Sequence, residues 1–105
     1  MPSSNTQSSL FPTTTKTDTE QRAKIFSALA DPTRLRIIEL LVDGGEMSSS
    51  EIANQAEISL ALLCHHSKIL AESGLVYTRK DGQTRYHQLN RQLLATCFAS
   101  LVKPA

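Results

Sequence analysis

The sequence contains little cysteine, no tryptophan and no long run of apolar residues. Its two cysteines, Cys64 and Cys97, are too few for the dense disulfide framework of a small secreted domain. No apolar run reaches the length that crosses a membrane, and the N-terminus lacks the basic start and apolar core of a signal peptide. We therefore expect a cytoplasmic protein that makes no contact with a membrane.

Residues that would mark an enzyme or a metalloprotein are also scarce. The chain has three histidines, and two of them, His65 and His66, are adjacent, whereas a two-histidine metal site on a helix needs a spacing of four residues. No nucleophile–base pair, phosphate-binding glycine loop or complete set of metal ligands is evident. We expect no enzymatic activity, no metal ion and no cofactor.

Charge is balanced over the whole chain but uneven along it. The net charge is +1, yet the residues up to Glu57 include five basic and eight acidic side chains, and Ile58–Arg91 includes five basic and two acidic ones. A basic second half is a weak indication of nucleic-acid binding. Taken alone, the asymmetry is more typical of an ordinary solvated surface.

Enough apolar residues remain for one small packed domain. Hydrophobic residues make up 40% of the 105-residue chain and charged residues 20%, which suits a single modest core. Residues 1–17 are rich in Ser, Thr, Asn, Gln and Pro, and cannot bury enough apolar surface to offset the entropy of ordering. We predict a flexible tail over residues 1–17, followed by one domain over residues 18–105.

The first part of the domain shows the periodicity of two amphipathic helices. Apolar residues one helical turn apart predict a helix over about 19–29. Asp31 and Pro32 are typical of the start of a second helix, and Gly44-Gly45 of its end. The expected apolar face of this second helix consists of Leu35, Ile37, Ile38, Leu41 and Val42.

Capping residues predict two further helices. Ser48 and Glu51 have the spacing of a capping box for a short helix over about 49–56. Ser59 can cap a longer helix that runs to about Glu72. A short helix joined by a tight turn to a longer one is the helix-turn-helix unit.

After this unit the apolar period changes from helical to alternating. Leu75–Arg79 and Thr84–Leu89 are predicted strands, and they flank a loop at Lys80–Gln83 whose Asp81-Gly82 pair is typical of a hairpin. Asn90 can cap a final helix. The predicted fold is mainly α with a small β-hairpin, a winged helix-turn-helix in which the hairpin is the wing.

A family resemblance is carried by five stretches: Ala28–Ile37, Ser50–Ala53, His66–Leu70, Glu72–Val76 and Asp81–Asn90. Together they resemble the ArsR/SmtB family of arsenic- and metal-responsive repressors over roughly residues 20–101. The resemblance implies a dimeric transcriptional repressor that binds a double-stranded DNA operator. It also implies that the first and last helices form the dimer interface.

The last helix is consistent with a homodimer. Its apolar residues form two stripes, of which one is Leu93, Cys97 and Leu101 and the other Leu94 and Phe98. Only one stripe can face the helix's own small domain. The second stripe is then available to a second copy of the chain.

The positions at which family members hold metals are occupied by other residue types here. Ser48 and Ser50 stand where many members carry a Cys-x-Cys pair, and serine hydroxyls are poor ligands for soft metals. In place of the zinc-binding Asp, His and Glu of other members, the last helix offers Gln92, Thr96, Cys97 and Ser100. Both familiar sensing sites are expected to be absent, and the inducing signal stays open.

The resemblance makes the helix from Ser59 the recognition helix. Its outer face is expected to hold Ser59, Leu60, Ala61, Cys64, His65 and Lys68. The start of this face is apolar and cannot form bidentate hydrogen bonds with bases. We therefore expect readout to depend on His65, on phosphate contacts and on DNA shape, and His66 to be a hydrogen-bonded core residue.

The expected wing carries a second group of candidate DNA contacts. Arg79, Lys80, Gln83 and Arg85 surround its tip and could hold phosphates or enter a minor groove. A solvated hairpin tip fits the same residues about equally well.

The two cysteines are the candidate thiol sensors. Cys64 should face DNA on the recognition helix, where an inert surface thiol fits as well as a sensor, and Cys97 is more typical of a small buried hydrophobe. The signal would be an oxidant, persulfide, arsenical or soft metal. A repressor with no small-molecule input, and a winged-helix module that binds another protein, remain the alternatives.

Overall fold

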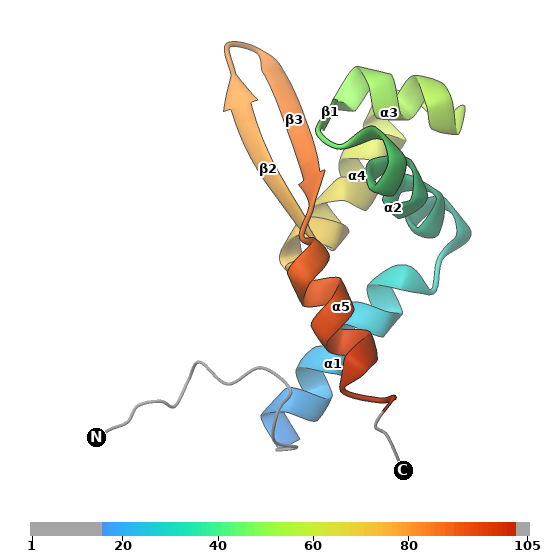
Figure 1. The fold of residues 1–105 in the computed structure, drawn as a ribbon. Coiled ribbons are helices and arrows are strands. Elements are labelled where there is room, and N and C mark those ends of the chain that lie inside the picture. Colours follow the sequence, from blue (N-terminus) through green and yellow to red (C-terminus); the bar gives the residue numbers. More distant parts are fainter. Residues whose placement is uncertain (1–15, 103–105) are drawn as a thin grey trace.

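The protein, described by a computed structural model over residues 16–102, consists of five helices and three strands (Figure 1). In chain order these are α1 (Lys16–Leu29), α2 (Pro32–Gly44), β1 (Met47–Ser48), α3 (Ser49–Ala56), α4 (Leu60–Glu72), β2 (Val76–Asp81), β3 (Thr84–Leu89) and α5 (Arg91–Ala99). This order confirms the predicted winged helix-turn-helix. It adds one element, the short strand β1.

The predicted capping residues begin four of the five helices. The carboxylate of Asp31 accepts a hydrogen bond from the Arg34 amide at 3.0 Å, and Ser48 forms the complete capping box of α3. The hydroxyl of Ser59 and the side-chain oxygen of Asn90 cap α4 and α5 in the same way. Each cap satisfies a backbone amide that the first turn of a helix leaves unpaired.

Helix α1 begins earlier than the apolar pattern predicts. It starts at Lys16, so its first two residues lie inside the predicted tail. The first turns of α1 contain no bulky apolar side chain, so hydrophobic periodicity carries no signal there. The rest of the predicted tail, residues 1–15, lies outside the described residues, as do 103–105.

The sheet is antiparallel, with strand order β1-β3-β2. Strand β1 was not predicted, because two residues are too short to show alternation. Strand β2 extends to Asp81, which pairs with Thr84, so the turn has two central residues, Gly82 and Gln83, rather than the four of the predicted loop. Gly82 has a φ of 65°, the left-handed backbone that the first central position of a type II′ hairpin turn requires.

The core lies between the helices and the inner face of the sheet. Its fully buried side chains are Ile25, Ile37, Leu41, Ile52, Leu63, Leu70, Leu75, His87 and Cys97. The predicted face of α2 is partly wrong, because Leu35 and Val42 are exposed and Leu40 is buried in their place. Leu35 and Val42 are seven residues apart and share the side of α2 that points away from the core.

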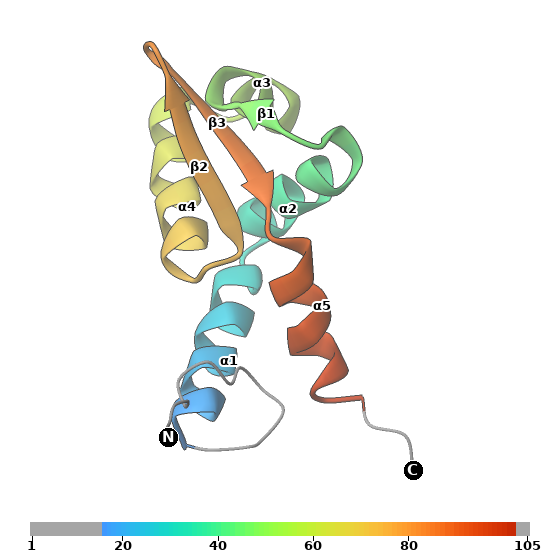
Figure 2. The same cartoon turned by 60° about the vertical axis from the view of Figure 1, so that its left-hand side comes forward.

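Helices α1 and α5 lie at the end of the molecule opposite the hairpin tip (Figures 1 and 2). They meet at Phe26 and Phe98, whose rings pack edge to face with centroids 5.8 Å apart. The start of α5 is tied to the rest of the domain by Arg91, which donates to the carbonyl of Val42 at 2.7 Å. None of the helices within residues 16–102 combines the length and apolarity needed to span a bilayer.

Candidate nucleic-acid interface

A tight turn joins α3 to α4. Glu57 adopts the left-handed conformation with a φ of 60° and ends α3. The amide of Ile58 then donates to the carbonyl of Ala53 at 3.0 Å, and Ser59 caps α4 immediately afterwards. The direction of α4 relative to α3 is therefore set by backbone hydrogen bonds.

The exposed face of α4 contains every residue that the sequence predicts there. Ser59, Leu60, Ala61, Cys64, His65 and Lys68 are all exposed. The opposite face packs into the domain through Leu63, His66, Ser67 and Leu70, which are buried. The predicted outward residues of this helix are confirmed as exposed, and Leu62 is exposed as well.

His66 is a hydrogen-bonded core residue, as the sequence predicts. Its Nδ1 atom lies 3.2 Å from an amino group of Arg34, whose Nε donates to the carbonyl of Ala28 at 2.7 Å. Burial lowers the pKa of His66, and the nearby carboxylate of Asp31 only partly opposes this. A neutral imidazole can accept the arginine hydrogen bond on Nδ1. Arg34 of α2 therefore links the end of α1, through Ala28, to α4, through His66.

The strand register separates the predicted wing cations into two groups. Lys80 pairs directly with Arg85, and Arg79 pairs with Tyr86. Because side chains alternate along a strand, Lys80 and Arg85 share the inner face of the hairpin with the buried His87. Arg79 lies on the outer face.

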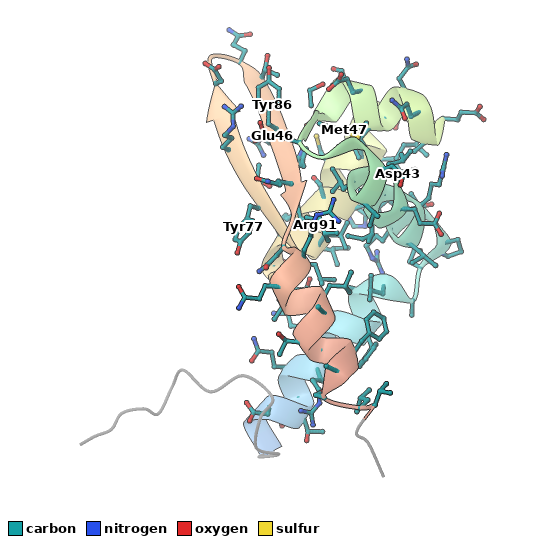
Figure 3. All side chains as sticks on the ribbon, in the orientation of Figure 1. Asp43, Glu46, Met47, Tyr77, Tyr86 and Arg91 are labelled. Atoms are coloured by element: carbon teal, nitrogen blue, oxygen red, sulfur yellow. The ribbon has the colours of Figure 1, made fainter. Side chains whose placement is uncertain are left out.

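On the outer face, Arg79 is held by Glu46 of the α2–β1 loop and by Tyr86. Glu46 and Tyr86 are labelled in Figure 3. The Nε and Nη2 atoms of Arg79 each donate to a Glu46 oxygen at 2.8 Å, and its guanidinium carbon lies 4.5 Å from the Tyr86 ring centroid. The hydrogen bond from Arg79 lowers the pKa of Glu46. Sequence reasoning missed Glu46, because nothing local marks an ion pair across 33 residues.

On the inner face, His87 connects the wing to the start of α3. Only 1% of it is exposed, and its Nε2 lies 2.7 Å from the hydroxyl of Ser49. Its Nδ1 lies 3.3 Å from the Thr78 hydroxyl, and Ser49 donates to the carbonyl of Arg85 at 3.4 Å. A neutral imidazole protonated on Nε2 satisfies all three contacts, and burial lowers the pKa of His87 accordingly.

Sequence reasoning did not identify His87 as a positioning residue. The alternation of the predicted strand over 84–89 could have placed it on the inner side, together with Leu89. The contact with Ser49 spans 38 residues and had no local signal.

A hollow of about 290 Å³ lies between α4, the start of α3 and the tip of the wing. It is lined by Ser49, Ser50, Leu60, Cys64, Gln83, Thr84 and Arg85. Four of the predicted site residues, Leu60, Cys64, Gln83 and Arg85, are thus brought together from separate parts of the sequence. Lys80 is the cross-strand neighbour of Arg85.

The two cysteines occupy contrasting environments. Both are free thiols; Cys64 is exposed and Cys97 is buried. Burial raises the pKa of the Cys97 thiol, which keeps it protonated and unreactive near neutral pH. Within residues 16–102, His, Cys, Asp and Glu side chains form no cluster of three or more that could hold a metal ion.

Comparison with protein families and with known proteins gives a consistent result. Residues 31–78 match the family described as bacterial regulatory protein, arsR family. The HTH-type transcriptional regulator YceK of Bacillus subtilis is 40% identical over 87 residues, which are 82% of this chain and 87% of that protein. An arsenical resistance operon repressor of Staphylococcus xylosus is 36% identical, and the match covers 71% of each chain.

Solved structures have the same arrangement of elements. HlyU from Vibrio cholerae superposes with a TM-score of 0.70 at 29% identity, over 80% of this chain and 91% of that one. The match spans most of both chains.

Proposed function

The chain belongs to the ArsR family of bacterial regulatory proteins, and from this membership we propose that it is a dimeric repressor that binds a double-stranded DNA operator in the cytoplasm. One observation carries the proposal. Leu60 and Cys64 of the exposed face of α4 line the same hollow as Arg85 of the inner wing face, and Lys80 is the cross-strand neighbour of Arg85. A DNA duplex could contact both faces at once.

In this proposal α4 enters the major groove. The N-terminal part of a recognition helix contacts base edges, and the residues around it bind the backbone. His65 and Lys68 are the exposed polar side chains of α4 closest to its centre. His65 would donate or accept at a base edge, and Lys68 would reach a phosphate.

The inner wing face would bind the DNA backbone. Like charges directly opposite each other on neighbouring strands are destabilising, yet Lys80 pairs with Arg85. Within the described residues neither side chain forms an ion pair or a side-chain hydrogen bond. A phosphate between them would offset the repulsion, and Gln83 at the tip could donate a further hydrogen bond.

The dimer would form through α1 and α5. Phe98, Leu101 and Val102 are exposed apolar residues at this end of the chain, and Phe98 already contacts Phe26 of α1. A two-fold axis there would present two α4 helices to half-sites about one DNA turn apart. Sedimentation under reducing conditions tests this directly: a monomer at micromolar concentration would contradict it.

The decisive experiment measures binding of the full chain to a duplex carrying the chain's own promoter, with a scrambled duplex as control. We expect tighter binding to the promoter, and an affinity for both duplexes that falls steeply with salt as counterions are released. A protein that binds neither duplex would instead support the alternative of a protein-interaction module.

We also propose that a thiol-directed signal, where one operates, acts at Cys64. The thiol lies on the exposed face of α4 and lines the hollow beside Leu60 and Arg85, so an adduct there would obstruct the groove directly. Cys97 is buried and would have to act through the dimer interface.

Cys64→Ser and Cys97→Ser, compared in DNA binding after mild oxidation or arsenite, separate these routes. We expect only Cys64→Ser to abolish the response. Loss of the response in Cys97→Ser alone would place the switch at the dimer interface, and an unchanged response in both variants would favour a repressor without a thiol input.

A further inference from the structure

The first turn of α4 presents apolar side chains where a DNA-reading helix needs contacts with base edges. The hydroxyl of Ser59 accepts the amide of Leu62 at 3.0 Å, so it is used as a cap. Leu60 and Leu62 are 51% and 41% exposed, and Ala61 between them is also exposed. The next outward polar side chain, His65, lies a full turn further along the helix.

Leu60 and Ala61 lie beside basic side chains of the wing and of α4. Leu60 lines the hollow together with Arg85 of the wing. Ala61 is four residues from His65 and seven from Lys68, spacings that place all three on one line along α4. A polyanion drawn to these cations would therefore cover Leu60 and Ala61, whereas an apolar protein partner would have to bury the cations.

The chemistry of the major groove restricts what such side chains can contact. Every base edge there offers hydrogen-bond donors or acceptors, and thymine alone also offers an apolar group, its 5-methyl. Apolar side chains pressed against the other edges would leave polar groups without partners. We propose that Leu60 and Ala61 form a site for thymine methyl groups, so that the operator carries thymine opposite the first turn of α4.

This inference rests on the proposed DNA-binding function and goes beyond it by assigning residues to the readout. Leu62 provides a matched control. It has the same chemistry and similar exposure, but it lies two residues from Leu60, about 200° around the helix, and so on the other flank of α4.

The test replaces thymine by deoxyuridine in the promoter duplex, one position at a time, which deletes the methyl group and preserves base pairing. For the full wild-type chain we expect one or two positions in each half-site at which binding weakens about fourfold, the loss expected for roughly one buried methyl group. Deoxyuridine outside the half-sites should have no effect.

The variants assign the site. Leu60→Ala should bind the thymine duplex more weakly and should no longer distinguish deoxyuridine at the sensitive positions, whereas Leu62→Ala should distinguish it as wild type does. Equal binding of both duplexes by a wild-type protein that still prefers its promoter would overturn the inference and leave the proposed function intact. An equal loss of discrimination in both variants would overturn the assignment, and failure to bind any duplex would refute the proposed function as well.

Discussion

The two faces of the wing place neighbouring cations in opposite situations. On the outer face, Arg79 is bound by both oxygens of Glu46 and stacks on Tyr86. On the inner face, Lys80 and Arg85 lie opposite each other, with no ion pair among the described residues. Basic residues adjacent in the sequence can therefore have different roles: Arg79 braces the hairpin, and the other two are available to a ligand.

The inner face also contains a buried side chain that connects the wing to the helix-turn-helix. His87 is buried and connects Thr78 to Ser49 at the start of α3, whereas the Glu46–Arg79 pair is exposed to solvent. Buried hydrogen bonds are costly to break, and exposed ion pairs contribute little. The two faces should respond differently to substitution.

The largest effect is expected from removal of the buried contact. His87→Ala should lower the free energy of unfolding by about 2 kcal/mol, because it removes the part-buried hydrogen bonds to Ser49 and Thr78 and opens a cavity where a buried side chain was. Chemical denaturation measures this. His65→Ala, which removes an exposed histidine of α4, is the control and should be close to neutral. If His87→Ala left the free energy of unfolding unchanged, the wing would be held by other contacts.

The same contact predicts the direction of the pH dependence. Burial lowers the pKa of His87 below its ordinary value of 6.5, so the unfolded chain binds a proton before the folded one. The contribution of His87 to the free energy of unfolding is fully present above about pH 6.5. It decreases as the pH drops from there toward the pKa of His87 in the folded protein. His87→Gln cannot titrate in this range. Its free energy of unfolding should therefore fall less between pH 7 and pH 5 than that of the wild type, and the difference should be roughly the contribution of one histidine. An identical loss in the variant would assign the dependence to other groups, such as His66.

The inner cations should dominate the affinity for DNA. Lys80→Ala with Arg85→Ala should weaken binding roughly tenfold at low salt on specific and random duplexes alike, because phosphate contacts carry no sequence information. The slope of log affinity against log salt should become shallower by about two units, one for each lost phosphate contact. Arg36→Ala, an exposed arginine of α2, is the matched control. A preserved slope with lost discrimination would mean that the wing reads bases.

The smallest effect is expected on the outer face. Arg79→Ala should weaken DNA binding about threefold, in line with the modest strength of exposed ion pairs, and should leave the salt slope unchanged. Exchanging the charges with Glu46→Arg and Arg79→Glu should restore much of the affinity, because an ion pair can form again between positions 46 and 79. If Arg79 binds phosphate instead, the slope will fall by about one unit and the exchange will not rescue binding.

Local interactions explain why much of the fold could be predicted. The caps at Asp31, Ser48, Ser59 and Asn90 connect residues three positions apart, so the sequence contains both partners side by side. The outward face of α4 follows from the helical period alone. The outward residues at this candidate interface were therefore identified without the structure.

The sequence by itself determined the helices, the hairpin and the list of exposed candidates. Tertiary structure alone decided which candidates meet. The turn at Gly82-Gln83 sets the register and so the face of each cation, since a shift of one residue exchanges the two faces of a strand. The partners of Arg79 and His87 lie 33 and 38 residues away. Contacts at that separation depend on the packing of the whole domain, which no local pattern encodes.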